Sequence, residues 1–192
     1  IREQCKTLVT IGACATSGGI QALRNWATMD EYINQIYANP EYIESLSTST
    51  AISDHVAVDF ELRGCPINKQ QLVVLISDLL HGRTPRVPTY SVCVECKRRL
   101  TVCVAVAKQI ACLGPITQAG CGAICPAYNR ECFGCYGPMP GANPQSLLNH
   151  YLDTGVERKH LVCLTRNFNG YAPAFREAST TLEKGVSDFN HN

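Results

Sequence analysis

Long apolar runs are missing from these 192 residues, and stretches such as Leu72–Ile76 are far too short to span a bilayer. The chain also lacks an excess of either charge, because 17 Lys and Arg residues face 16 Asp and Glu residues for a formal net charge of +1. This balance removes any argument from overall charge for nucleic-acid or polybasic membrane binding. Ile1–Thr7 is polar and shows no signal-peptide pattern. We therefore expect no membrane span and no nucleic-acid partner.

Motifs for nucleotides and for histidine-based metal sites are absent as well. The chain has neither a P-loop nor a complete Gly-x-Gly-x-x-Gly fingerprint, so the sequence indicates no nucleotide site. Its five histidines show no metal-ligand spacing, and none lies between His81 and His150. A metal in that stretch must therefore be held by sulfur. With 45% apolar and only 17% charged residues, disorder is excluded for most of the chain.

Cysteine is the residue that the chain does have in quantity. Eight of its 12 cysteines fall between Cys93 and Cys135. Disulfide frameworks belong mostly to short secreted chains, whereas this chain is longer and its first half indicates an ordinary α/β core. We therefore disfavour disulfides and retain two alternatives, structural zinc and iron–sulfur clusters.

Two units of the same layout make up the first half. Lys6–Ile11 predicts a buried strand that runs into the small-residue turn Gly12–Gly19, with helical stretches near 20–26 and 30–38. Val56–Leu62 alternates apolar and polar residues as a second strand and ends in Gly64-Cys65-Pro66. A helix is predicted over Asn68–His81, with Asn68 as N-cap and Gly82 after its end. Its apolar face consists of Leu72, Leu75, Ile76, Leu79 and Leu80.

Each unit thus places a cysteine just beyond the end of a strand. Because parallel strands deliver their carboxyl ends to one edge of a sheet, we expect Cys14 and Cys65 to converge on one site. The alternative is that each is a small buried apolar residue, as free cysteine often is.

The cysteine-dense segment supplies enough thiols for two complete four-thiolate sites. Its members are Cys93, Cys96, Cys103, Cys112, Cys121, Cys125, Cys132 and Cys135. Zinc ribbons usually pair two Cys-x-x-Cys units for each metal, whereas only two such units occur here and the other spacings are irregular. Cys125-Pro126 also repeats the Cys-Pro that ends the bacterial ferredoxin run. These features favour iron, and a structural zinc module that mediates protein contacts is the alternative.

The remaining residues of note have ordinary explanations. Five basic residues against two acidic ones in this segment would ease the addition of an electron to anionic clusters, or could simply be a solvated surface. Cys5 and Cys163 match no motif; we interpret Cys5 as structural and Cys163 as a core residue. Residues 144–152, 156–166 and 173–184 look helical and are expected to pack against the cysteine-dense segment or a partner.

Several motifs, taken in order, carry a family resemblance over nearly the whole chain. They are Gly12-Ala-Cys14-Ala with Gly18-Gly19, Arg63-Gly-Cys65-Pro66, Val92-Cys93-Val-Glu-Cys96, Ala111-Cys112-Leu-Gly-Pro115 through Cys121, Ile124-Cys125-Pro126, Cys132-Phe-Gly-Cys135 and Asn167-Phe-Asn-Gly170. The set resembles the small, electron-transferring subunit of nickel–iron hydrogenases and the related 20 kDa-type subunit of complex I. The delta subunits of cytosolic, NAD(P)-linked sulfhydrogenases are the nearest match, and the methanogen-type gamma subunits are more distant.

This resemblance implies 4Fe–4S clusters in a chain. A proximal cluster would sit in a flavodoxin-like domain facing the nickel–iron centre of a large subunit, and two more in a ferredoxin-like domain. Cys14 and Cys65 match the last two proximal ligands, but the Cys-x-x-Cys that supplies the first two is not in this sequence. We therefore expect an N-terminally shortened version without the opening βαβα portion, two clusters, and a partial third.

The expected architecture is α/β in three parts. Residues 1–84 would form a partial flavodoxin-like parallel-sheet domain, 85–140 a ferredoxin-like two-cluster domain, and 141–192 a helical C-terminal extension. A local grouping gives Cys93, Cys96, Cys103 and Cys112 to one cluster and Cys121, Cys125, Cys132 and Cys135 to the other. Two-cluster ferredoxins instead exchange one ligand between the two halves, and spacing does not choose between these arrangements.

The function implied by the resemblance is electron transfer without bond chemistry in this chain. The subunit would be cytoplasmic and would relay electrons between the nickel–iron site of a hydrogenase large subunit and a flavin- and iron–sulfur-bearing diaphorase-type partner. No residue is expected to be catalytic, because the cysteines would fix only the position and potential of the clusters.

Overall fold

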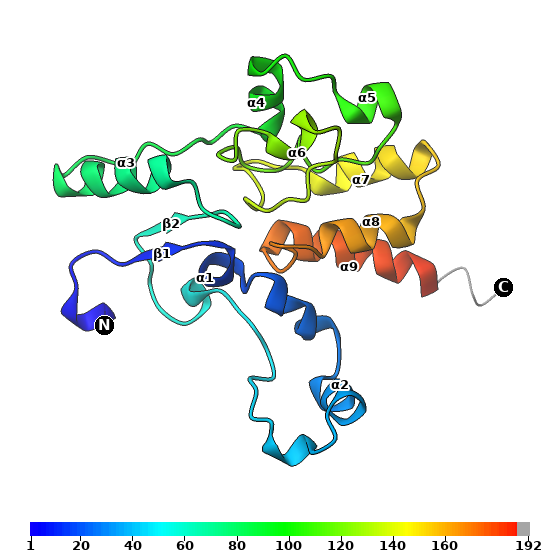
Figure 1. The fold of residues 1–192 in the computed structure, drawn as a ribbon, viewed down its shortest axis with the longest axis horizontal. Helices are drawn as coiled ribbons and strands as arrows, with labels where there is room; N and C mark the ends of the chain where they lie inside the picture. Colours follow the sequence, from blue (N-terminus) through cyan, green and yellow to red (C-terminus); the bar gives the residue numbers. More distant parts are fainter. Residues whose placement is uncertain (188–192) are drawn as a thin grey trace.

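A computed structural model describes residues 1–187 as a mixture of short helices and strands with one small parallel sheet (Figure 1). The elements are the 3-10 helices η1 (Arg2–Gln4), η2 (Ile20–Trp26), η3 (Pro40–Tyr42) and η4 (Ile52–Asp54), the strands β1 (Val9–Ile11) and β2 (Phe60–Leu62), and the α-helices α1 (Ala13–Ser17), α2 (Met29–Ile36), α3 (Lys69–Leu80), α4 (Val92–Arg98), α5 (Val104–Lys108), α6 (Ile124–Ala127), α7 (Pro144–Asp153), α8 (Arg158–Thr165) and α9 (Pro173–Ser187). No helix within residues 1–187 is both long and apolar enough to cross a membrane.

The two predicted strands pair in parallel, but each is only three residues long. Val9 lies opposite Phe60, and Ile11 lies opposite Leu62. The predicted strands were longer at their starts because the alternating pattern continues there. The carboxylate of Asp59 accepts the backbone amide of Leu8 at 2.8 Å, so a side chain replaces the ladder at this point.

Helix α3 confirms the predicted boundaries within one residue. The Asn68 side chain accepts hydrogen bonds from the amides of Gln70 and Gln71, and Gly82 follows the helix with a φ of +65°. The expectation that its apolar face is buried is wrong for most of that face: Leu75 is 2% exposed, whereas Leu80 is 80% exposed. The physical reason is size, since two strands of three residues cannot cover a helix of 12 residues.

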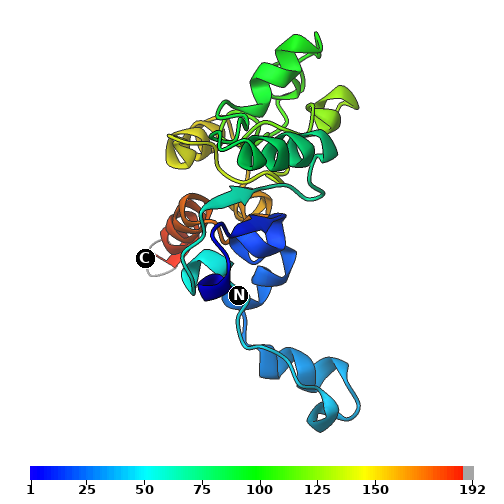
Figure 2. The same cartoon turned by 90° about the vertical axis from the view of Figure 1, so that its left-hand side faces the viewer.

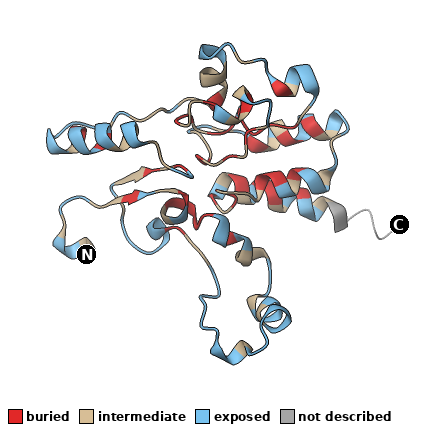
Figure 3. Ribbon diagram, viewed as in Figure 1, coloured by how far each residue is buried: buried red, intermediate tan, exposed pale blue. Residues whose placement is uncertain are grey.

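The principal core joins the cysteine-dense segment to the C-terminal helices. Leu113 and Ile116 pack with Leu148 of α7, Leu161 of α8 and Phe175 of α9. Figure 3 shows buried residues concentrated along α7, α8 and α9 and in the loops beside them. The three helices confirm the predicted helical tail and its packing against the cysteine-dense segment, whereas residues 188–192 and His191 lie outside the described residues.

The cysteine-dense segment itself contains little regular structure. The short helices α4, α5 and α6 are joined by loops, and two isolated antiparallel bridges tie Ser91 to Gln118 and Thr117 to Pro138. Four residues other than glycine adopt positive φ values in this segment, among them Gln109 and Ala123. The segment is therefore shaped by side chains and by loop hydrogen bonds more than by helices or sheets.

Residues 27–48, here called the arm, extend away from the rest of the molecule (Figures 1 and 2). The arm contains α2 and η3, and none of its residues is buried. Its base is fixed, because the Asn25 side chain donates to the carbonyl of Ser49 at 2.6 Å and accepts the amide of Ser49 at 2.8 Å. The arm thus contributes little to the core although its two ends are held together.

We expect replacement of residues 29–46 by a short Gly/Ser linker to leave the thermal midpoint within about 2 °C of the parent chain, because exposed segments contribute roughly 0.5 kcal/mol or less. Leu148→Ala, at a fully buried position of α7, is the matched comparison and should cost about 2–5 kcal/mol. Differential scanning calorimetry measures both. A large loss of stability in the linker variant would contradict this account of the arm.

Candidate functional site

The loops after the two strands lie side by side. The amide of Gly12 donates to the carbonyl of Leu62 at 2.8 Å, and the amide of Ala13 donates to the carbonyl of Gly64 at 3.0 Å. Burial raises the pKa of Cys65, and the nearby Cys14 thiolate raises it further. The two cysteines therefore come together as the strand-end argument predicts. Both are exposed, so the alternative that they are buried apolar residues does not hold.

Four cysteines form a first neighbourhood at one end of the cysteine-dense segment. Cys93 and Cys96 lie on α4, and Cys103 precedes α5 as its N-cap. Burial raises the pKa of Cys96 to about 11, with further contributions from Cys93, Cys112 and Cys103. Burial likewise raises the pKa of Cys93, helped by Cys112 and Cys103. These mutual effects group the same four residues as the local spacing does.

A second neighbourhood surrounds a cavity of about 470 Å³. Cys121, Cys125 and Cys135 line it, and Cys65 enters it from the strand-end loop. Burial raises the pKa of Cys135 to about 12, with Cys121, Cys125 and Cys65 adding to the rise and the backbone amide of Cys65 opposing it. The cavity wall is otherwise partly apolar and includes Ile124, Phe133, Tyr136 and Phe168.

Cys132 lies between the two neighbourhoods and does not line the cavity. It is 4% exposed, and burial raises its pKa well above the ordinary value, with contributions from both Cys112 and Cys135. Its amide donates to the sulfur of Cys112 at 3.2 Å. Which four cysteines share a cluster therefore stays a prediction, with Cys132 as the residue on which the two arrangements differ.

The surroundings of the thiols suit anionic sulfur ligands. The amides of Cys132 and Gly114 donate to the sulfur of Cys112 and oppose the effect of burial on its pKa. A side chain at Gly114 would place its Cβ 3.4 Å from the sulfurs of both Cys112 and Cys93, so glycine keeps this space open. The hydroxyl of Tyr151 accepts the Cys112 amide and donates to its carbonyl, which fixes this cysteine from α7.

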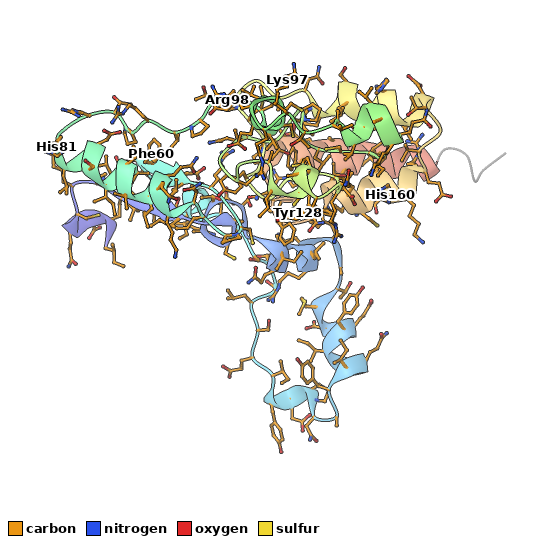
Figure 4. All side chains as sticks on the ribbon, turned by 45° about the horizontal axis from the view of Figure 1, so that its top comes forward. Phe60, His81, Lys97, Arg98, Tyr128 and His160 are labelled. Carbon is orange, nitrogen blue, oxygen red and sulfur yellow. The ribbon has the colours of Figure 1, made fainter. Side chains whose placement is uncertain are left out.

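These donors fit an iron–sulfur cluster better than a histidine-containing site. The sulfurs are many, partly buried and approached by amides, which is the environment that sets cluster potentials. Among the described residues, no three His, Cys, Asp or Glu side chains are drawn tightly enough together for a single metal ion. Figure 4 shows His81 at the far end of α3 and His160 on the opposite side of the molecule, on α8.

Tyr136 joins the strand-end loop to the second neighbourhood. It is 3% exposed, and its hydroxyl donates to the carbonyl of Pro66 at 3.2 Å. Gly64 and Gly120 flank its ring, and a Cβ at either position would approach ring carbons to 2.8 and 2.5 Å, respectively. The interpretation of Tyr136 as a packing residue is thus confirmed, and its packing connects two groups of cysteines. Tyr128, by contrast, is exposed.

The sequence analysis missed two polar residues that organise the site. Glu95 stands between Cys93 and Cys96 and accepts hydrogen bonds from the loop that carries Cys121. Asn169 is 2% exposed and binds Ser17, Gly134 and Cys135. Asn169 belongs to a motif already noted, but a single sequence does not show which of its residues is buried.

The two remaining cysteines differ from each other. Cys5 is half-buried, with its sulfur 3.8 Å from the carbonyl of Arg2, and agrees with a structural role. Cys163 was expected in the core and is exposed. On α8 its neighbours Leu161 and Leu164 face the core, and Cys163 lies on the other side of that helix. Lys97 and Arg98 lie at the outer edge of the cysteine-dense segment, as Figure 4 shows.

Comparison with known proteins places the chain among hydrogenase subunits. Residues 1–79 match the family described as NADH ubiquinone oxidoreductase, 20 Kd subunit. Sulfhydrogenase 2 subunit delta of Pyrococcus furiosus is 36% identical over 137 residues, covering 71% of this chain and 57% of the relative. The chain thus spans a little over half of that relative's length.

A second relative is matched over more of its length. This subunit of the vhu F420-non-reducing hydrogenase of Methanocaldococcus jannaschii is 31% identical over 201 residues, covering 88% of this chain and 70% of the relative. Among solved structures, an NAD+-reducing [NiFe]-hydrogenase in the H2-reduced state matches with a TM-score of 0.40 and 29% identity, covering 45% of this chain and 56% of that one. The chain belongs to the hydrogenase small-subunit-like family that includes the Pyrococcus and Methanocaldococcus relatives, and is a component of the oxidoreductase class.

Proposed function

We propose that this chain holds two 4Fe–4S clusters on the cysteines of residues 85–140 and relays electrons within a cytoplasmic, NAD(P)-linked nickel–iron hydrogenase or sulfhydrogenase. Its partners are a large subunit with a nickel–iron centre on one side and a diaphorase-type subunit on the other. The observation that carries the proposal is the gathering of eight cysteines, six of them with raised pKa values from burial and mutual proximity, in a member of a hydrogenase family.

The residues of this chain act as ligands and as an enclosure. Bound clusters would supply one-electron carriers. Cys93, Cys96, Cys103 and Cys112 would hold one, and Cys121, Cys125, Cys132 and Cys135 the other, in the local arrangement. Around the cavity, apolar side chains such as Ile124 and Phe133 restrict water, while Tyr136 separates it from the loop of Cys65.

The strand-end cysteines extend the same scheme toward the large subunit. Cys14 and Cys65 are exposed and lie together, and they would be two ligands of a proximal cluster. The Cys65 amide donates to the sulfur of Cys135. This hydrogen bond provides a direct connection between the proximal pair and the second neighbourhood, as an electron relay needs.

An iron, sulfide and zinc count on anaerobically purified protein tests the proposal. We expect a brown protein with about eight irons and as much acid-labile sulfide per chain, on the stoichiometry of two four-iron clusters, and visible absorption that bleaches on reduction. About 12 irons would mean that the proximal site is also filled. A colourless protein with stoichiometric zinc and no iron would support the structural zinc module instead.

A further inference from the structure

Glu95 has an unusual position for a charged side chain. It lies on α4, separated from Cys93 and Cys96 by one residue or none, and it is half-buried. One carboxylate oxygen accepts the amide of Gly120 at 3.0 Å, and the other accepts the amide of Ala123 at 3.2 Å. The second oxygen also lies 3.9 Å from the sulfur of Cys121. A side chain from the first neighbourhood therefore holds the loop that carries a ligand of the second.

No cation neutralises this carboxylate. Within residues 1–187 Glu95 forms no salt bridge, although three basic residues follow it closely on α4 and at its end. Arg98 instead stacks on the ring of Tyr90, with its guanidinium carbon 5.1 Å from the ring centre. Arg99 donates to the carbonyl of Gly122 at 2.7 Å. Glu95 and Arg99 thus hold the same loop from one helix, the first through amides and the second through a carbonyl.

Two effects of Glu95 on a cluster bound at Cys121 have the same sign. A fixed negative charge beside a ligand sulfur opposes the addition of an electron. The Ala123 amide also approaches the sulfur of Cys121, so the carboxylate competes with that sulfur for a hydrogen bond. Amide hydrogen bonds to ligand sulfur favour the reduced cluster, and sharing one weakens that preference.

We propose that Glu95 is a positioning residue that fixes the Gly120–Ala123 loop and lowers the reduction potential of the cluster bound by Cys121 relative to the other cluster of the segment. This inference rests on the proposed function. It gives the two clusters of the relay different potentials through a single side chain, without any difference in ligand type.

The test compares three forms of the full chain, loaded with iron and sulfide, by redox titration followed by electron paramagnetic resonance. In E95Q the charge is lost while one acceptor oxygen is kept, and we expect one of the two potentials to rise. The expected shift is about tenfold in the reduction equilibrium, which is 59 mV for one electron. The other potential should move much less.

Arg99→Gln is the matched control, because it loosens the same loop but removes a positive charge. If Glu95 acted only as an anchor for the loop, R99Q and E95Q would shift the potential in the same direction. On our proposal R99Q leaves the potential unchanged or lowers it. Equal upward shifts in both variants, or no shift in a fully loaded E95Q, would overturn the inference.

Iron analysis separates this inference from the proposed function. A parent chain that binds no iron overturns the proposed function itself. A loaded parent chain with an unchanged E95Q potential overturns only the role of Glu95. Should E95Q fail to load, R99Q decides alone, since an upward shift there would show that loosening the loop is sufficient to raise the potential.

Discussion

Replacing Cys135 by alanine should remove about half of the bound iron, on the stoichiometry of two four-iron clusters, whereas replacing Cys163 should remove none. Cys135 lines the 470 Å³ cavity and lies close enough to Cys121, Cys125 and Cys65 for their charges to raise its pKa. Losing one of four thiolates leaves an iron without its protein ligand in a partly buried site, which protein-bound clusters rarely tolerate. Iron and sulfide analysis of anaerobically purified variants measures the effect.

Cys163→Ala is the matched control because it removes the same thiol from an exposed position on α8. Both variants lower the cysteine count of the chain by one, so a nonspecific loss of thiols would affect them equally. Equal iron contents in the two variants would contradict the assignment of Cys135. The same comparison made with Cys132→Ala would show whether the residue between the two neighbourhoods is a ligand at all.

Replacing Asn169 by alanine should lower the free energy of unfolding by about 2–3 kcal/mol. Its side-chain oxygen accepts the hydroxyl of Ser17 at 2.6 Å, and its side-chain nitrogen donates to the carbonyl of Cys135 at 2.7 Å. These bonds join α1, the loop before α9 and the cysteine-dense segment in a fully buried place. The variant would leave the buried carbonyl of Cys135 without this donor, and such a group costs more than the net value of the bond.

Urea denaturation followed by circular dichroism measures this loss, and Asn167→Ala is its control. Asn167 belongs to the same four-residue motif, is half-buried, and makes no side-chain hydrogen bond within the described chain. We expect its replacement to change stability by less than about 0.5 kcal/mol. A loss of similar size in both variants would mean that the motif acts through its backbone and that Asn169 has no special part.

Both experiments address features that the sequence revealed to different degrees. The eight cysteines of the dense segment and their exclusion of histidine could be read directly, because the chemistry of a thiolate does not depend on the fold. Helix α3 was equally accessible, since an N-cap, a periodic apolar face and a closing glycine are local signals. The family resemblance followed from the order of short motifs and is confirmed by the relatives.

Other features depended on contacts between distant parts of the chain. The side of α8 on which Cys163 lies, and the exposure of most of the apolar face of α3, follow from what those helices pack against. The connection made by Tyr136 between Pro66 and the cavity spans 70 residues. The contacts of Asn169 with α1 span 152 residues. No local pattern announces partners at such separations.

The sequence by itself thus determined the ligand chemistry, the helix positions and the family, because each depends on residue type and on short-range periodicity. Only the tertiary structure decided which cysteines lie near one another, that Cys65 reaches the cavity of Cys121, Cys125 and Cys135, and that Glu95 holds the loop of Cys121. The physical reason is that this segment has few regular elements whose geometry could be extrapolated. Its shape depends on individual hydrogen bonds between loops, and those form only when the whole chain has folded.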